Sequence, residues 1–122
     1  MNGVSLEVFH KMDHKTNINE LKEKVRKFCE DRDWDQYHNA KELAIGIAVE
    51  ASELLEQFRF KSEKEIEGFF KDPKKREEIE EEVADTLYFI LRLAQRYNID
   101  LTTSLNKKMD KNEPPRPKGR GI

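Results

Sequence analysis

The sequence of 122 residues contains few of the residues that interrupt helices. It has five glycines and four prolines, and only Gly46, Gly68 and Pro73 lie away from the two ends of the chain. A β-sandwich or β-barrel needs many more turn residues than these. The sequence therefore excludes an all-β fold and predicts an all-α one.

Long apolar runs and an excess of basic charge are also absent. No run approaches the roughly 20 apolar residues of a membrane helix, and residues 1–7 show no signal-peptide pattern. The 23 basic and 25 acidic residues give a net charge of −2, whereas a protein that binds nucleic-acid polymers has a basic excess. The single cysteine, Cys29, cannot form an internal disulfide. We therefore expect a cytoplasmic protein that binds neither a membrane nor a nucleic-acid polymer.

Capping patterns predict where five helices begin. Each start is an Asn, Ser or Asp that can cap a helix, and three of these residues have Glu three positions later. The capping residues are Asn17, Asn39, Ser62, Asp72 and Asp100. The first predicted helix ends near residues 31–33, the second near residue 58 and the fourth near residue 97. The third is short and precedes Asp72, and the fifth lies near residues 101–111.

Apolar residues recur every three or four positions in the predicted helices, so each helix has one apolar face. In the second helix we expect this face to contain Leu43, Ala44, Ile47, Ala48, Ala51, Leu54, Leu55 and Phe58. In the fourth helix we expect Ile79, Val83, Leu87, Ile90 and Ala94 to point inward, and the fifth helix carries Leu101, Leu105 and Met109. The helical domain thus spans residues 17–112, between an N-terminal arm (1–16) and a basic tail rich in Pro and Gly (113–122).

Four acidic residues lie at the edges of these apolar faces. Glu50 and Glu53 share one side of the second helix, because residues three apart lie on the same side. Glu82 and Asp85 do the same on the fourth helix. Such carboxylates are costly unless they are paired or bound to a cation, and oxygen ligands without His or Cys select Mg²⁺ or Mn²⁺. Each pair alone is typical of a charged surface helix. The two pairs together leave two interpretations open, surface ion pairs and a four-carboxylate metal site.

The segment between the first two helices carries an indole and an imidazole, Trp34 and His38. A Trp in a loop beside a His can stack on a nucleobase, whereas a Trp that closes the end of the core fits the same position. The location of Trp34 just before the helix that carries Glu50 favours a binding pocket.

Several short motifs are similar to those of one enzyme family. They are Arg32-Asp-Trp34, His38, Lys41, Glu50-Ala-Ser-Glu53, Glu82-Val-Ala-Asp85 and Lys108-Met-Asp-Lys-Asn112. Together they resemble the MazG-like all-α nucleoside triphosphate pyrophosphohydrolases, and most nearly their dCTP pyrophosphatase group. The resemblance implies a bundle of four to five helices that hydrolyses a dCTP-like (deoxy)nucleoside triphosphate to monophosphate and pyrophosphate.

The resemblance also implies roles for individual residues. The four acidic residues would hold Mg²⁺, with Mn²⁺ as a substitute, and Lys108 and Lys111 would contact the phosphates. The other substrate-binding residues would be Trp34, His38, Lys41, Phe60, Phe89 and Asn112. Phe60 stands where close members of the family have Trp, so the aromatic wall is kept while the preferred base stays open.

Attack of water on the α-phosphorus fits the acidic residues independently of the resemblance. This reaction needs neutralisation of the phosphate charge, which two metal ions can provide. It also needs a group that orients or deprotonates the water, and we expect Glu53 to have this role.

The apolar content bears on assembly. Modest amphipathic helices in a chain with 36% apolar residues leave core surface uncovered, and symmetric association is the usual solution. Members of the family form dimers and tetramers, so we expect a homo-oligomer, with the tetramer favoured over the dimer. Two alternatives stay open: a phosphoribosyl-ATP pyrophosphohydrolase of the same architecture, and a non-catalytic helical nucleotide-binding or adaptor module.

Overall fold

The computed structural model describes residues 12–112, which form five α-helices and two short 3₁₀ turns and contain no β-strand. In chain order the elements are η1 (Asp13–Lys15), α2 (Ile18–Asp31), η2 (Asp35–Tyr37), α3 (Ala40–Glu56), α4 (Glu63–Lys71), α5 (Pro73–Arg96) and α6 (Leu101–Asn112). The all-α expectation is confirmed. Most of the predicted arm and the whole predicted tail lie outside the described residues.

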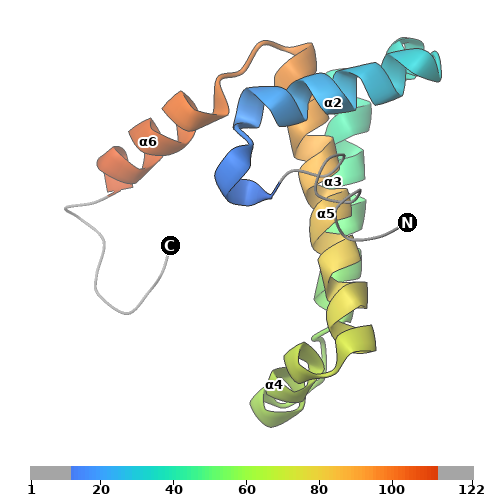
Figure 1. Cartoon of the computed structure of the whole chain (residues 1–122), viewed down its shortest axis with the longest axis vertical. Helices are drawn as coiled ribbons and strands as arrows, with labels where there is room; N and C mark the ends of the chain where they lie inside the picture. The colour runs from blue at the N-terminus through green and yellow to red at the C-terminus, as the bar shows by residue number, and fades with distance from the viewer. Residues whose placement is uncertain (1–11, 113–122) are drawn as a thin grey trace.

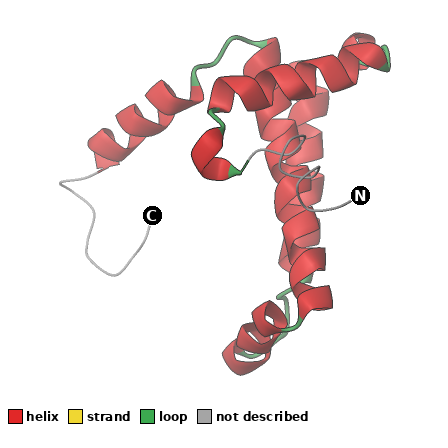
Figure 2. Ribbon diagram, viewed as in Figure 1, coloured by secondary structure: helices red, strands yellow, loops and turns green. Residues whose placement is uncertain are grey.

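Helices α3 and α5 run antiparallel and side by side, and together they form the long spine of the molecule (Figure 1). Helix α2 packs across one end of this spine, near the C-terminal half of α5, and α4 lies at the other end. Helix α6 extends away from the spine (Figures 1 and 2). The two helices that carry the predicted acidic pairs are therefore neighbours.

The helix starts follow the predicted caps. In all five, the capping side chain accepts a hydrogen bond from a backbone N–H of the first turn, at 2.8–3.1 Å. At Ser62 the reciprocal bond from its own N–H to the Glu65 side chain is also present. The predicted end of α3 near Phe58 was wrong by two residues, because the helix ends at Glu56 and residues 57–60 form a turn.

The buried apolar core of the described residues is small. It contains Cys29, Leu43, Ile79, Leu91 and Ala94. The inward placement of Val83 and Leu87 was wrong, because these side chains are 50% and 41% exposed. Exposed apolar side chains also lie on α3, at Ala44, Ala48, Ala51 and Leu55, and on α6, at Leu105 and Met109. The physical reason is that α5 has 24 residues, and its packed neighbours leave part of its apolar face uncovered.

No helix in the region 12–112 has the length and apolar character required to span a membrane.

Candidate active site

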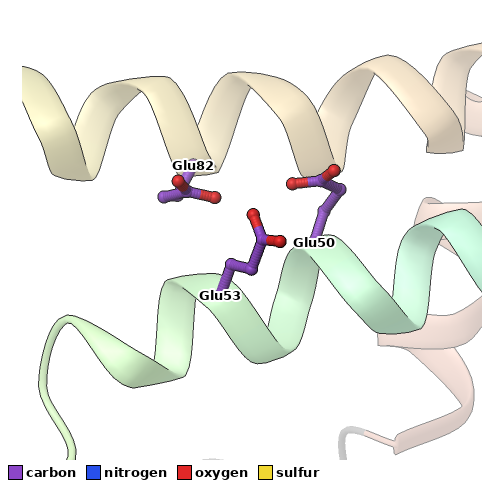
Figure 3. Close-up of side chains that lie close together, drawn as sticks. All are labelled: Glu50, Glu53 and Glu82. Carbon is purple, nitrogen blue, oxygen red and sulfur yellow. The ribbon is translucent and has the colours of Figure 1, made fainter.

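Three of the four predicted carboxylates converge between the spine helices. Glu50 and Glu53 extend from α3 towards α5, and Glu82 extends from α5 towards them (Figure 3). One carboxylate oxygen from each residue lies within 4.8 Å of one from each of the others. The i, i+3 spacing places Glu50 and Glu53 on one side of α3, and the antiparallel pairing brings Glu82 opposite.

Asp85 lies one turn beyond Glu82 on α5 and contributes to the same negative region. It raises the pKa of both Glu50 and Glu82 electrostatically, and it lines the adjoining cleft. It is not part of the close three-oxygen group, and its side chain is exposed. The structure therefore gathers three carboxylates tightly and places the fourth beside them.

The three-oxygen group is electrostatically strained. Desolvation, followed by the charge of Glu53, raises the pKa of Glu50 above its ordinary value, and the same two causes raise the pKa of Glu82. Oε2 of Glu50 and Oε2 of Glu82 are both enclosed, and neither has a hydrogen-bond partner among the described residues. Clustered carboxylates of this kind are stabilised by a cation, and an all-oxygen donor set suits Mg²⁺ or Mn²⁺.

A glycine allows the spine helices to approach closely beside this group. A Cβ atom at Gly46 of α3 would lie 2.6 Å from Cδ1 and Cε1 of the Phe89 ring on α5. Real Cβ atoms do not approach a ring so closely, so only glycine fits the observed packing. Gly46 thereby determines where Phe89 stands, and Phe89 forms one wall of the neighbouring cleft.

An aromatic cleft of about 580 Å³ adjoins the carboxylates, within the range of roughly 300–1,000 Å³ that is typical of small-ligand pockets. Its lining residues are Phe28, Trp34, Tyr37, His38, Glu50, Asp85, Tyr88 and Phe89. A cleft that combines aromatic walls with carboxylates at one side suits a ligand with a flat ring and a metal-bound anionic group.

The local chain geometry explains why Trp34 reaches this cleft. Helix α2 ends at Asp31, and Asp33, two residues later, is in the left-handed region at φ 58°. The N–H of Trp34 then donates to the carbonyl oxygen of Cys29 at 3.0 Å. The N–H of Asp33 donates to the carbonyl oxygen of Glu30, also at 3.0 Å. This is the Schellman arrangement, in which the residue after the left-handed one packs back on the helix. Accordingly, the Trp34 and Phe28 rings meet edge to face at 5.8 Å.

Tyr88, one of the lining residues of the cleft, is hydrogen-bonded to a cysteine of the core. Sγ of Cys29 and Oη of Tyr88 lie 3.1 Å apart in a hydrogen bond. Burial and this contact raise the pKa of Tyr88 far above its ordinary value, so its phenol stays protonated. Cys29 is fully buried, so it is a small residue of the core.

Five of the predicted substrate-binding residues do not line this cleft within one chain. Lys41 is exposed in the first turn of α3, and Phe60 is 90% exposed in the turn after α3, with the Arg59 guanidinium over its ring. The other three, Lys108, Lys111 and Asn112, lie on α6, which extends away from the spine. The predicted residues that do line it are Trp34, His38, Glu50, Asp85 and Phe89.

Sequence reasoning missed Arg92 and Asp35. Arg92 is fully buried, its guanidinium forms an ion pair with Asp35, and its Nε donates to Nδ1 of His38. A signal was available, because Arg92 is the one charged residue in the apolar stretch 87–94. A charge inside such a stretch is costly unless it is paired, so the stretch itself predicts a buried partner.

Comparisons with known proteins agree with this geometry. The sequence matches the MazG-like family over residues 45–122. It is 36% identical over 85 residues to dCTP pyrophosphatase 1 of Rattus norvegicus and 34% identical over 85 residues to that of Homo sapiens. Each match covers 70% of this chain and 50% of the relative. The chain therefore belongs to the MazG-like family, and it spans about half the length of the curated relatives it matches.

The fold has a solved counterpart. A crystal structure of a pyrophosphatase from Archaeoglobus fulgidus matches with a TM-score of 0.74 at 34% identity. The match covers 88% of this chain and 97% of that one. The expected MazG-like helical fold is thereby confirmed.

Proposed function

We propose that this protein hydrolyses (deoxy)nucleoside triphosphates, with dCTP-like nucleotides preferred, to the monophosphate and pyrophosphate in a Mg²⁺-dependent reaction. The observation that carries this proposal is the convergence of Glu50, Glu53 and Glu82 beside an aromatic cleft. The similarity to proteins named dCTP pyrophosphatase supports the choice of substrate. A purely structural or adaptor role would not require enclosed, unpartnered carboxylate oxygens next to a cleft.

The residues present fit a divalent cation. The donor set consists only of carboxylates, and the enclosed oxygens of Glu50 and Glu82 have no other partner among residues 12–112. Glu50, Glu53, Glu82 and Asp85 would hold Mg²⁺, with Mn²⁺ as a substitute. When bound, the metal neutralises phosphate charge and lowers the pKa of a coordinated water.

The protein's own groups then have defined tasks. Glu53 is the most exposed of the three clustered carboxylates, and it orients the attacking water and accepts its proton. The water oxygen bonds to the α-phosphorus, the bond between this phosphorus and the bridging oxygen breaks, and pyrophosphate leaves with that oxygen. The aromatic walls formed by Trp34 and Phe89 hold the base, since stacking on aromatic side chains suits any nucleobase.

We also propose that association of identical chains completes the site. Helix α3 has 17 residues and therefore spans about 25 Å, and Trp34 and Phe60 lie beyond its opposite ends. We infer that Phe60, at the far end of α3 from Trp34, reaches the nucleotide from a second chain. Helix α6 extends away from the spine, and its residues Lys108, Lys111 and Asn112 would reach a neighbouring cleft in the same way. The exposed apolar side chains of Val83 and Leu87 support such association, and we favour a tetramer over a dimer.

A cytoplasmic location completes the proposal. Cys29 is a free, buried thiol, as is usual in a reducing compartment.

The direct test is a panel of nucleoside triphosphates and deoxynucleoside triphosphates, together with phosphoribosyl-ATP, assayed for pyrophosphate release with Mg²⁺ and with EDTA. We expect release from dCTP or a related deoxynucleotide that EDTA abolishes. Pyrophosphate release from phosphoribosyl-ATP alone would establish the alternative enzyme. Absence of turnover with every nucleotide would instead establish a non-catalytic binding module.

A further inference from the structure

The interior of the described domain contains one buried charged side chain, that of Arg92 on α5, with 0% exposure. A buried guanidinium is tolerated only when it is paired and its N–H groups are satisfied. All three of its nitrogens are engaged: Nη2 with the Asp35 carboxylate, Nη1 with Oε1 of Gln95 at 2.6 Å, and Nε with Nδ1 of His38 at 2.9 Å. This arrangement forms a network that joins η2 and the residue after it to α5.

The network determines the protonation state of His38. A guanidinium only donates hydrogen bonds and is not deprotonated in proteins, so Nδ1 of His38 must accept. The imidazole is then neutral and carries its proton on Nε2. Burial, followed by the nearby charges of Arg92 and Arg96, lowers the pKa of His38, which agrees with the neutral form.

The backbone at His38 is also held by a hydrogen bond. Nε of Arg96 donates to the carbonyl oxygen of His38 at 3.3 Å, and the Trp34 ring lies 6.1 Å from the imidazole. His38 lines the aromatic cleft, and its Nδ1 is occupied by Arg92. The group that His38 offers to a ligand in the cleft is therefore the Nε2–H donor.

We propose that Arg92 and Asp35 are positioning residues that fix His38 in its Nε2–H form, and that His38 uses this proton to donate a hydrogen bond to an acceptor atom of the bound nucleotide. The acceptor is a base carbonyl oxygen or an unprotonated ring nitrogen, because a fixed donor rejects an N–H or NH₂ group at the same place. This inference rests on the proposed nucleotide site and adds a specificity contact to it.

Spectroscopy tests the tautomer without any turnover. The chain has three histidines, His10, His14 and His38, so ¹⁵N-labelled imidazole signals can be assigned with a His38→Gln control. At pH 7 and without nucleotide, we expect His38 to show a protonated Nε2 and an unprotonated Nδ1. In Arg92→Met, which keeps side-chain length but removes every donor, we expect a mixture of tautomers. A wild-type His38 with its proton on Nδ1, or with both nitrogens protonated, would overturn the inference.

Two substitutions at His38 separate the donor from the structural contact. Gln places an amide N–H near the position of Nε2, whereas Asn places its polar atoms near Nδ1. We expect His38→Gln to keep a KM for dCTP near that of the wild type and His38→Asn to raise it about tenfold, the typical effect of one lost hydrogen bond, with smaller changes in kcat. If KM for dCTP instead rises in His38→Gln and stays near the wild-type value in His38→Asn, only the contact to Arg92 matters, and the proposal is overturned.

If Arg92→Met does not fold, these two His38 variants still test the proposal, because neither removes the buried ion pair between Arg92 and Asp35. Thermal melting of each variant confirms that it is folded. A wild-type protein that releases no pyrophosphate from any nucleotide contradicts the proposed function, and with it the donor role. An active wild type that has the wrong tautomer, or the reverse order of variants, contradicts the His38 inference alone.

Discussion

The carboxylates Glu50, Glu53, Glu82 and Asp85 have different surroundings, and these suggest different tasks. Glu50 and Glu82 each have an enclosed oxygen and a raised pKa, as expected of groups that hold a cation. Glu53 and Asp85 are more exposed and accessible to solvent and substrate. Two predictions follow from this difference between carboxylates that bind the cation and carboxylates that contact water and substrate.

The first concerns Glu53 and Asp85. Glu53→Gln and Asp85→Asn keep side-chain size but remove a charge that acts on the metal or on the water. We expect each to lower kcat by at least about two orders of magnitude and to keep the helical circular-dichroism spectrum. Glu67→Gln, an exposed glutamate on α4, is the control and should remain fully active. Near-wild-type turnover of either site variant at saturating Mg²⁺ would rule out the four-carboxylate site.

The second concerns Glu50 and the metal-free fold. Because its folded-state pKa is raised, its protonation stabilises the fold. That stabilisation is fully present below its ordinary pKa and is lost as pH rises through the raised value. In EDTA at pH 7, Glu50→Gln should therefore melt at a higher temperature than the wild type. In Mg²⁺ the difference in melting temperature between the two proteins should become smaller or change sign, since the wild type alone gains the full stabilisation from the cation.

Scanning fluorimetry in EDTA and in Mg²⁺ measures both effects, with and without a nonhydrolysable triphosphate. A lower melting temperature for Glu50→Gln in EDTA would show that the carboxylates do not repel one another. A wild-type melting temperature that Mg²⁺ leaves unchanged in both conditions would argue against a metal site.

At the scale of elements, the pairing of α3 with α5 depends on Gly46. Gly46→Ala brings a methyl group against the Phe89 ring, so the ring must move towards the cleft or the helices must separate. Overpacking of this kind costs about 1–3 kcal/mol, which outweighs the gain of roughly 1 kcal/mol from replacing glycine in a helix. We expect a lower melting temperature and a higher KM for the nucleotide.

The matched control is Gly68→Ala in α4. A Cβ atom there has no neighbour within 4 Å, so only the helix-propensity gain of up to about 1 kcal/mol remains. The melting temperature of this variant should rise and its KM should not change. Equal stabilisation by both substitutions would contradict the close approach of α3 and α5.

The helices also indicate how far the sequence alone can predict this structure. The caps at Asn17 and Ser62 were predictable, because an N-cap depends on residues within one turn. The carboxylate cluster was predictable from two local pairs on predicted faces. The exposure of Val83 and Leu87 was not, because periodicity identifies an apolar face but not what covers it. The pairing of His38 with Arg92 joins residues 54 positions apart. The apolar stretch around Arg92 predicts that it has a buried partner, but a local pattern does not identify which residue this is.

At the scale of the whole molecule, grouped apolar side chains are exposed to solvent on two helices. Val83 and Leu87 lie one turn apart on α5, and Leu105 and Met109 lie one turn apart on α6; all four are exposed. Single exposed apolar residues are common, but grouped ones mark interaction sites. The proposed oligomer would cover them and would bring Phe60 and the α6 residues to a neighbouring cleft.

We therefore expect the wild type to sediment as a tetramer, or as a dimer, in analytical ultracentrifugation. Leu87→Glu should shift the distribution towards smaller species, since a buried unpaired charge destabilises an apolar interface. Glu67→Lys, an exposed change on α4, should leave it unchanged. A wild-type monomer that is fully active would contradict the proposal that a second chain completes the site.

The central claim is that a water held at the carboxylate cluster attacks the α-phosphorus of a nucleoside triphosphate. Hydrolysis of dCTP in ¹⁸O-labelled water with Mg²⁺, followed by mass spectrometry of both products, tests this claim most directly. The account predicts one labelled oxygen in the monophosphate and none in the pyrophosphate, with the reaction lost in EDTA and reduced at least about a hundredfold in Glu53→Gln. Label in the pyrophosphate, or a rate that neither EDTA nor the Glu53 substitution changes, would contradict it.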